Sequence, residues 1–373
     1  MDFCSNGDSA MSVGLSHDEP GQDIRANLLK QIRGSRVRIP DLKSLLSHWP
    51  EEIHPRVDDL DQHVRATLEW IFMDPKDDHR LRKMKASNVG LLVASWYPYA
   101  SFEALCVMAT FFIWLFAWDD GVVRLKLISD LNTNYEVETD SFEFSPLIQS
   151  LDSATAFRDQ TMKFVRESLA RRKPEGFAVA NAPRLISSFE SVGAAVRKSY
   201  NDDQIKRFLD ELTFFIQMCE EEHSSQKIDR LPTFEEYMRR RMGSSAVGVC
   251  LALNDYTNGF TLPEDIMLDD FMKIIWHEAN IIVSVMNDVV SIKKEIVQSQ
   301  VDSLLPLLFL RYGSIQTALD HAVHIVSSSI GRLETAERDI LNRYSTATAE
   351  TQEKLRLHIK ACKLACTGNL NWR

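Results

Sequence analysis

The chain has 373 residues, of which 45% are apolar and 26% charged, and its 53 acidic against 43 basic side chains give a formal net charge of −10. This composition is that of a globular protein and excludes the collagen-like, disulfide-scaffold and disordered classes. Because an acidic chain repels a polyanion, we expect no nucleic-acid partner.

The N-terminal segment, residues 1–22, is rich in Ser, Gly and Asp and has neither a basic start nor an apolar stretch. We therefore expect a disordered leader, not a signal or transit peptide. From Ile24 onward apolar residues recur three and four positions apart, and the alternation typical of strands is almost absent. The apolar stripes lie within residues 64–72, 102–118, 208–219 and 271–286. With no Gly/Ser linker and no repeat of fixed period, an all-α fold is predicted, with residues 23–373 forming one domain.

Cysteine usage and apolar run length predict the compartment. Six cysteines are dispersed along the chain, which favours a reduced, cytoplasmic protein. Cys362 and Cys366 share a helix face, but no second Cys or His pair completes a zinc site, so we expect them to pack. The longest apolar run, residues 105–118, is shorter than the roughly 20 residues that span a bilayer. We therefore expect a buried helix and no membrane insertion, while the oligomeric state, a homodimer included, stays open.

The first candidate site is the sequence Trp118-Asp119-Asp120-Gly121, which follows the most apolar stretch of the chain. Two carboxylates at the end of a buried helix are costly to desolvate, and the helix dipole disfavours anions there. A bound metal ion would satisfy both. The alternative is a helix that emerges into water and ends in an Asp-Asp-Gly turn.

The second candidate site is the segment from Asn287 to Glu295. Asn287, Ser291 and Glu295 are spaced four residues apart, so in a helix they share one face and offer an amide oxygen, a hydroxyl and a carboxylate. Three hard oxygen ligands suit Mg²⁺, which completes its octahedron with water or phosphate oxygens. A phosphorylated ligand is therefore indicated. The alternative is an ordinary solvated face of an amphipathic helix.

Taken together, the two sites resemble the class I terpene cyclases, in particular the fungal-type and other microbial sesquiterpene synthases. The aspartate pair after an aromatic-rich helix and the later Asn-Asp-x-x-Ser-x-x-x-Glu motif carry most of the resemblance. Residues 94–100, 236–241 and 368–372 extend it over most of the chain beyond about residue 40. The resemblance implies a single large α-helical bundle of the class I terpenoid synthase type, which encloses a central active-site cavity.

The resemblance implies a set of metal ligands. Asp119 matches the first aspartate of the family's acidic motif, which ligates two of three Mg²⁺ ions, and Asp120 matches a supporting position. Asn287, Ser291 and Glu295 match the ligands of the remaining ion.

The resemblance also implies the groups that bind diphosphate. Arg241 is the expected diphosphate sensor because it precedes residues 243–246, a run of small side chains where the family breaks a helix; Arg240 is the alternative. Lys294 matches a diphosphate-contacting lysine of fungal members. The expected catalytic residues are Asp119, Asp120, Arg241 and Ser245.

The sequence departs from the family pattern at two places. The family's acidic motif usually has a third acid four positions after the first, where this chain has Val123. The family also usually has an Arg-Tyr pair soon after a signature like residues 368–372, whereas this chain ends at Arg373. The dipeptide occurs at residues 311–312 and 343–344, before that signature, where we expect it at the surface or in packing.

The resemblance implies an apolar cavity beneath the metal site. Helical spacing places one group of candidate lining residues before Asp119 and another before Asn287. They are Phe112, Leu115, Phe116, Trp276, Asn280, Val283 and Ser284. For each of them the alternative is core packing.

The expected function is Mg²⁺-dependent ionisation and cyclisation of farnesyl diphosphate to a sesquiterpene hydrocarbon or alcohol, with release of diphosphate. We prefer farnesyl over geranylgeranyl diphosphate because the aromatic residues between 111 and 118 are bulky and would shorten a cavity. A diterpene cyclase, a trans-prenyltransferase and a noncatalytic helical scaffold are the alternatives. The prenyltransferase would need a second aspartate-rich motif, and the segment from Asn287 to Glu295 is of a different kind.

Overall fold

The computed structural model describes residues 24–123, 151–225 and 228–372, with the backbone alone for 120–123 and 151–153. Every regular element in these residues is a helix, so the all-α prediction is confirmed there. The predicted leader, residues 1–22, lies outside the described residues, and the assignment of residues 23–373 to one domain stays a prediction.

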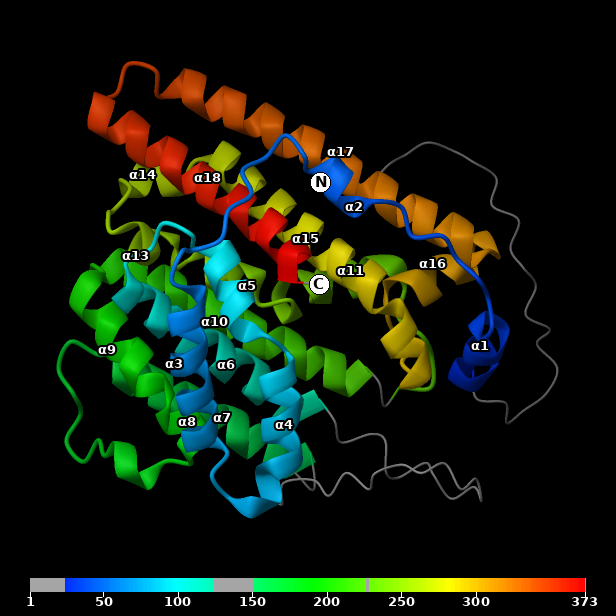
Figure 1. The fold of residues 1–373 in the computed structure, drawn as a ribbon, viewed down its shortest axis with the longest axis horizontal. Coiled ribbons are helices and arrows are strands. Elements are labelled where there is room, and N and C mark those ends of the chain that lie inside the picture. Colours follow the sequence, from blue (N-terminus) through cyan, green and yellow to red (C-terminus); the bar gives the residue numbers. More distant parts are fainter. Residues whose placement is uncertain (1–23, 124–150, 226–227, 373) are drawn as a thin grey trace.

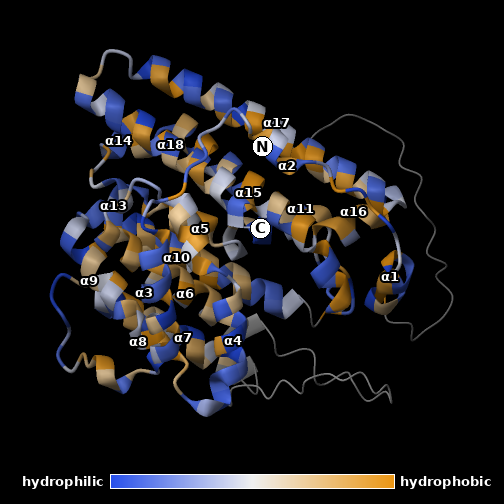
Figure 2. Cartoon of the chain, in the orientation of Figure 1, coloured by the Kyte–Doolittle hydropathy of each residue, from blue (hydrophilic) through white to orange (hydrophobic). Residues whose placement is uncertain are grey.

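The N-terminal third supplies the helices that lead to the aspartate pair. They are α1 (Ile24–Ile32), α2 (Leu42–Leu45), α3 (Val57–Ile71), the 3₁₀ turn η1 (Pro75–Asp77), α4 (Asp78–Ala86), α5 (Val89–Trp96) and α6 (Phe102–Val123). In Figure 2, α5 and α6 are largely hydrophobic at the centre of the fold, whereas α17 at its edge alternates hydrophobic and hydrophilic residues.

The middle of the chain continues the bundle with shorter helices around one long one. They are α7 (Leu151–Leu169), η3 (Val179–Asn181), α8 (Arg184–Ser187), α9 (Phe189–Ser199), α10 (Asp202–Ser225), α11 (Phe234–Ser244), α12 (Val247–Leu251), α13 (Asn254–Asn258) and α14 (Glu264–Met267).

Four helices complete the described chain. They are α15 (Asp270–Val297), α16 (Leu304–Tyr312), α17 (Ile315–Arg343) and α18 (Ala349–Trp372). The long helix α15 packs against both α17 and α18, as Figure 1 shows. Asp269 caps the start of α15 by accepting a hydrogen bond from the Phe271 amide at 2.9 Å. The second candidate site therefore lies near the C-terminal end of a helix that α17 and α18 help to fix.

Helix α6 forms the centre of an aromatic core. Its window Phe102–Asp119 is long and apolar enough to cross a membrane by composition alone, but 67% of that window is buried inside the protein. On one face of α6, the rings of Phe111, Trp114 and Trp118 stack on one another. They also pack against aromatic rings of α9 and α10. The buried-helix prediction is confirmed, and this packing fixes where the aspartates at its end emerge.

A break between α11 and α12 shapes the centre of the molecule. Thr233 and Glu236 form a capping box that starts α11. The helix ends at Ser244, and Ala246 takes a left-handed conformation with φ of 59° before α12 begins. Gly243 permits close approach to α10, since a Cβ there would lie 2.4 Å from Met218 Cγ. The helix break expected from the small residues 243–246 is thus present.

Candidate active site

The second candidate site forms a polar face near the end of α15. Asn287, Ser291 and Glu295 are all half-buried and follow one another along the helix. The Ser291 hydroxyl donates a hydrogen bond to Glu295 Oε1, and Ser303 Oγ donates to Oε2 at 2.7 Å. These side chains offer the hard oxygen donors that Mg²⁺ prefers.

The electrostatics of Glu295 favour a cation beside it. Burial and the nearby Asp288 raise the pKa of Glu295, and the hydrogen bonds from Ser291 and Ser303 and the charge of Arg241 lower it less. Within the described residues, no group of three His, Cys, Asp or Glu side chains could hold a metal by itself. A metal here would therefore use Asn287, Ser291 and external oxygens such as phosphate.

Arg241 reaches this face from α11. Its Nη2 and Nε donate to Asp288 Oδ1 at 2.9 and 3.1 Å, and Tyr237 Oη donates to Asp288 Oδ2 at 2.5 Å. Burial alone would lower the pKa of Arg241, but Asp288, Tyr237, Glu222 and Glu295 outweigh it and raise that pKa. The arginine is thus fixed in place and fully charged beside Glu295.

The end of α6 meets the same region through α10. Asp119 is half-buried, and its Oδ1 lies 3.9 Å from the thiol of Cys219. Burial raises the pKa of Cys219, as do Asp119 and Glu222, whereas Arg158 and Arg241 act in the opposite direction. Asp119 and Arg241 both lie close enough to this buried thiol to shift its pKa, so the two candidate sites lie in one part of the bundle. The side chains of Asp120 and Val123 lie outside the described residues.

Residues 110–332, which contain both candidate sites, match the family model described as terpene synthase family 2, C-terminal metal binding. The match covers more than half of the chain. The chain belongs to terpene synthase family 2. It is therefore a terpene cyclase, and the resemblance read from its sequence is confirmed.

Two fungal relatives match this terpene synthase along most of its length. The sesquiterpene cyclase hepA of Aspergillus oryzae is 28% identical over 359 residues, covering 95% of this chain and 90% of the relative. The terpene cyclase braA of Annulohypoxylon truncatum is 26% identical over 371 residues, covering 98% and 92%.

Solved structures show the same fold. An α-eudesmol synthase superposes with a TM-score of 0.71 at 16% identity, over 91% of this chain and 98% of that one. A hedycaryol synthase in complex with nerolidol superposes with a TM-score of 0.65 at 14% identity, over 91% and 99%. The predicted class I terpenoid synthase fold is confirmed.

The residues expected to line the terpene synthase cavity from α6 are divided between two surroundings. Phe112 is buried and meets Trp96 edge-on at 5.3 Å between ring centroids. Phe116 stacks on Trp372 at 5.8 Å, which brings the end of α18 to α6. Leu115 is buried beside them. Phe111, Trp114 and Trp118 face the aromatic core instead, so most of the ring bulk expected to shorten the cavity serves packing.

The residues expected to line the cavity from α15 hold the helix break. Ser245 and Ser284 donate to Asn280 Oδ1 at 2.8 and 3.0 Å, and Asn280 Nδ2 donates to the Met242 carbonyl at 2.7 Å. Val283 is buried on the same helix. Ser245, Asn280 and Ser284 thus fix the turn that follows Arg241.

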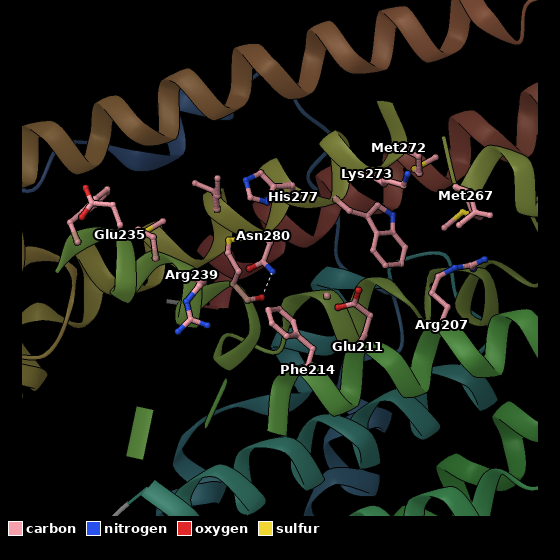
Figure 3. Close-up of a pocket in the computed structure, with 17 residues that line it drawn as sticks. Arg207, Glu211, Phe214, Glu235, Arg239, Met267, Met272, Lys273, His277 and Asn280 are labelled. Atoms are coloured by element: carbon pink, nitrogen blue, oxygen red, sulfur yellow. Dashed lines mark hydrogen bonds between the residues drawn. The ribbon is translucent and has the colours of Figure 1, made fainter. Parts of the chain in front are cut away.

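Trp276 lines a different hollow from the metal-binding face. A pocket with a volume of about 650 Å³ lies between α10, α11, α14 and α15 (Figure 3). Trp276 and Asn280 are among its lining residues, whereas Asp119, Arg241 and Asn287 are not. Trp276 therefore lines a pocket apart from these three residues, and its place in the active-site cavity stays a prediction.

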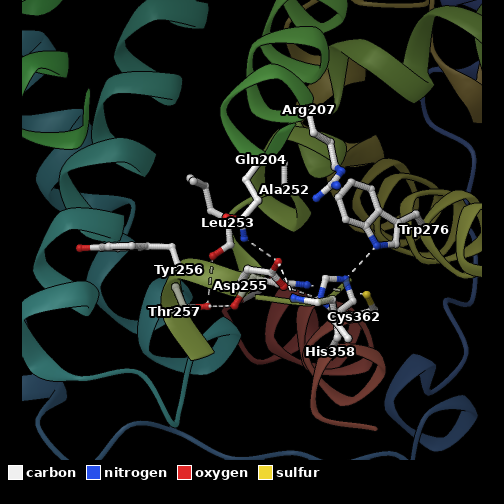
Figure 4. A network of polar contacts seen from close by, with 12 residues as sticks. Gln204, Arg207, Ala252, Leu253, Asp255, Tyr256, Thr257, Trp276, His358 and Cys362 are labelled. Atoms are coloured by element: carbon white, nitrogen blue, oxygen red, sulfur yellow. Dashed lines mark hydrogen bonds and ion pairs between the residues drawn. The ribbon is translucent and has the colours of Figure 1, made fainter. Parts of the chain in front are cut away.

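A buried polar network holds Trp276 in place (Figure 4). Trp276 Nε1 donates to His358 Nε2 at 3.1 Å, and His358 Nδ1 lies 3.0 Å from Asp255 Oδ1. Gln204 Nε2 donates to Asp255 Oδ2 at 2.9 Å. Because Trp276 can only donate, the neutral His358 carries its proton on Nδ1 and donates it to Asp255. Burial raises the pKa of Asp255, but the bonds from His358 and Gln204 outweigh it and lower that pKa.

The basic residues at the periphery of the site have different surroundings. Lys294, the expected diphosphate contact, is exposed, as is Lys293, so the structure does not distinguish the two. Arg343 donates to Asp269 Oδ2 at 2.7 Å, and Tyr344 donates to the same oxygen at 3.3 Å, at the start of α15. Arg343 and Tyr344 therefore pack, as expected, at the end of α15 opposite Glu295.

Sequence reasoning missed the groups that hold Arg241. Asp288 lies within the motif but was given no role, although a buried carboxylate beside an arginine needs a partner. Tyr237 precedes Arg241 by four residues, and that helical spacing places both on one face. Nothing in the sequence pairs Asp255 with His358, which are separated by 103 positions.

Proposed function

We propose that this terpene synthase ionises and cyclises farnesyl diphosphate to a sesquiterpene hydrocarbon or alcohol, with release of diphosphate, at a site holding three Mg²⁺ ions. The observation that carries the proposal is the oxygen-donor face of α15 beside the charged Arg241. Similarity to relatives such as the sesquiterpene cyclase hepA supports the fifteen-carbon substrate.

The metal ligands in this proposal are Asp119, Asn287, Ser291 and Glu295, with Asp120 in a supporting role. Their donor set fits Mg²⁺, because it consists of carboxylate, amide and hydroxyl oxygens and includes a carboxyl whose pKa is raised by burial. When bound, Mg²⁺ neutralises charge on the leaving diphosphate.

Arg241 binds the diphosphate in this proposal. Two of its nitrogens, Nε and Nη2, donate to Asp288, so its orientation is set before substrate arrives. Among the described residues no acceptor is bonded to its Nη1, which is the nitrogen we assign to diphosphate. A donor fixed in advance stabilises developing charge without reorganising at the moment of ionisation. Lys294 adds a second positive charge from the end of α15.

Apolar walls protect the allylic cation that ionisation leaves. Phe112 and Phe116 present ring faces or edges from α6, and Leu115 and Val283 add aliphatic surface. An aromatic ring offers a cation about 2 kcal/mol when water is excluded. The Ser245 and Asn280 bonds keep the adjacent helix break closed against solvent in this proposal.

The setting of the reaction is part of the proposal. Four of the described cysteines are buried and all five are free, which supports a reduced cytoplasmic environment.

The test is incubation of the purified chain with geranyl, farnesyl or geranylgeranyl diphosphate and Mg²⁺, followed by gas chromatography and mass spectrometry. We expect cyclic fifteen-carbon products from farnesyl diphosphate, and none after chelation with EDTA. Cyclic product from geranylgeranyl diphosphate alone would establish a diterpene cyclase instead. Chain elongation on adding isopentenyl diphosphate would establish a prenyltransferase.

A further inference from the structure

The pocket between α10, α11, α14 and α15 has the dimensions of a ligand site. Its volume of about 650 Å³ lies within the roughly 300–1,000 Å³ of small-molecule sites. Asn280 forms part of its wall and bonds the Met242 carbonyl, one residue after Arg241. The pocket therefore lies behind the α11–α12 break, separated by that wall from the metal-binding face.

The walls of this pocket are apolar and partly adaptable. Four methionines and two phenylalanines line it, together with Trp276; they are Met238, Met242, Met267, Met272, Phe214 and Phe234. Methionine side chains adjust to irregular ligands because they are unbranched and flexible. Trp276 is instead rigid, because its indole nitrogen is bonded to His358. Leu268 lies at the mouth and is 58% exposed, an apolar side chain that a ligand would cover.

One carboxyl faces this apolar space without a donor. Glu211 rises from α10 toward α15 in Figure 3, and a Cβ on Gly248 would lie 2.2 Å from its Oε2, so the carboxyl fills the space that glycine leaves. Burial, with a smaller contribution from Asp210, raises the pKa of Glu211, and the charge of Arg207 lowers it less. No donor in the described part of the chain bonds to it. A shielded carboxyl of this kind is stabilised when a ligand hydroxyl donates a hydrogen bond to it.

Three of the four basic side chains that line the pocket are paired with carboxylates, and His277 is the fourth. Arg207 bonds to Glu264, Arg239 to Glu221, and Lys273 to Asp270. Glu211 would therefore repel an anionic ligand such as a diphosphate or a fatty acid, and none of these three basic side chains is unpaired to offset that repulsion. The charge pattern favours a neutral ligand that donates one hydrogen bond.

We propose that this pocket binds a neutral isoprenoid alcohol, with its branched chain against Trp276 and the methionines and its hydroxyl donating to Glu211. Such an alcohol has two sources, a linear prenyl alcohol or a cyclic terpene alcohol, which share this chemistry. The site is separate from the catalytic one and goes beyond the proposed reaction.

The test is calorimetric titration of the full chain with farnesol, with Mg²⁺ and saturating farnesyl thiolodiphosphate present to fill the catalytic site. We expect saturable binding of one farnesol, and about tenfold weaker binding of farnesene, which has the chain without the hydroxyl. Cedrol, a cyclic terpene alcohol, forms a second arm, and the stronger ligand identifies the source. The readout is binding, so it does not depend on which diphosphate the enzyme cyclises.

Two variants and a control locate the ligand. Glu211→Leu should remove the preference for farnesol over farnesene, whereas Gln217→Leu, an exposed change on the same helix, should retain it. Leu268→Arg should weaken both ligands, because it places a charge at the mouth. Since Leu268 is exposed, that variant should fold even if Glu211→Leu does not, as circular dichroism will show.

Four results would overturn the proposal. They are the absence of saturable binding, equal affinity for farnesol and farnesene in the unchanged protein, binding that disappears when farnesyl thiolodiphosphate is added, and equal or stronger binding of 1-dodecanol. The third would place the alcohol in the catalytic cavity, and the last would assign the pocket to unbranched alcohols.

Discussion

Glu295 and Asp255 are both carboxylates held within the helical bundle, yet their surroundings act on them in opposite directions. Asp255 accepts hydrogen bonds from His358, from Gln204 and from the Leu262 amide, and together they lower its pKa despite burial. Among the described residues, two serines are the donors to the Glu295 carboxylate, and burial with Asp288 nearby raises its pKa.

The difference separates a structural carboxylate from one prepared for a ligand. The donors around Asp255 complete its requirements, so the network can rigidify the fold without any further group. Around Glu295 the charge of Arg241 and the two serine donors do not offset burial and the nearby Asp288, so the charged carboxylate costs stability unless a further cation binds. An active site that is to bind a metal ion needs the second condition.

The largest effect should come from removing a metal ligand. We expect Glu295→Gln to lower turnover about a thousandfold and Asp119→Asn to do the same, because each removes an oxygen that would hold Mg²⁺. Since the folded-state pKa of Glu295 is raised, the charged form is destabilised above that pKa, and Glu295→Gln should leave the free energy of unfolding unchanged or higher. Kinetics at saturating farnesyl diphosphate and urea unfolding measure the two quantities.

The control for that experiment is Asp270→Asn, an exposed carboxylate at the start of the same helix. Its turnover should equal that of the unchanged enzyme. Near-normal turnover of Asp119→Asn or Glu295→Gln would show that the metal ligands are assigned wrongly.

A second effect should come from the arginine beside Asp288. We expect Arg241→Gln to lower turnover about a hundredfold, because the diphosphate loses a preorganised donor and Asp288 loses its cation. Affinity for inorganic diphosphate at fixed Mg²⁺, measured by calorimetry, should fall with it. Arg240→Gln is the matched comparison on α11, and an equal loss in that variant would transfer the role to Arg240.

Disrupting the network of Asp255, His358 and Trp276 should change the stability of the protein and leave its Mg²⁺ requirement unchanged. We expect His358→Phe to lower the free energy of unfolding by about 3 kcal/mol, because it removes one of the donors to the buried Asp255 and leaves the Trp276 indole without its acceptor. The Mg²⁺ concentration that gives half-maximal turnover should not change. Adding Asp255→Leu to that variant should recover part of the stability, and a shift in the Mg²⁺ requirement instead would join this network to the catalytic site.

The smallest effect should come from the partly exposed pair at the start of α15. We expect Arg343→Ala to leave the free energy of unfolding nearly unchanged, because the pair is exposed on the arginine side and Asp269 keeps its bonds from the Phe271 amide and Tyr344. Affinity for inorganic diphosphate should be unchanged. A tenfold loss of that affinity would mean that Arg343 reaches the diphosphate and that its packing against Asp269 is not its function.

The sequence alone determined the helical fold and the motifs of this protein, because both depend on neighbours close in the chain. Apolar spacing located α6, α10 and α15, and small residues located the break after Arg241. Spacing of four residues also placed Asn287, Ser291 and Glu295 on one face.

Only the tertiary structure decided what each helical face meets. Spacing cannot say that Phe111 and Trp118 pack into the core while Phe112 and Phe116 turn toward Trp96 and Trp372. It likewise cannot assign Trp276 to the pocket of Glu211, because that depends on how α10 and α15 pack. Periodicity fixes a residue's angle around its own helix, whereas its partners depend on contacts between helices distant in the chain, which no local pattern encodes.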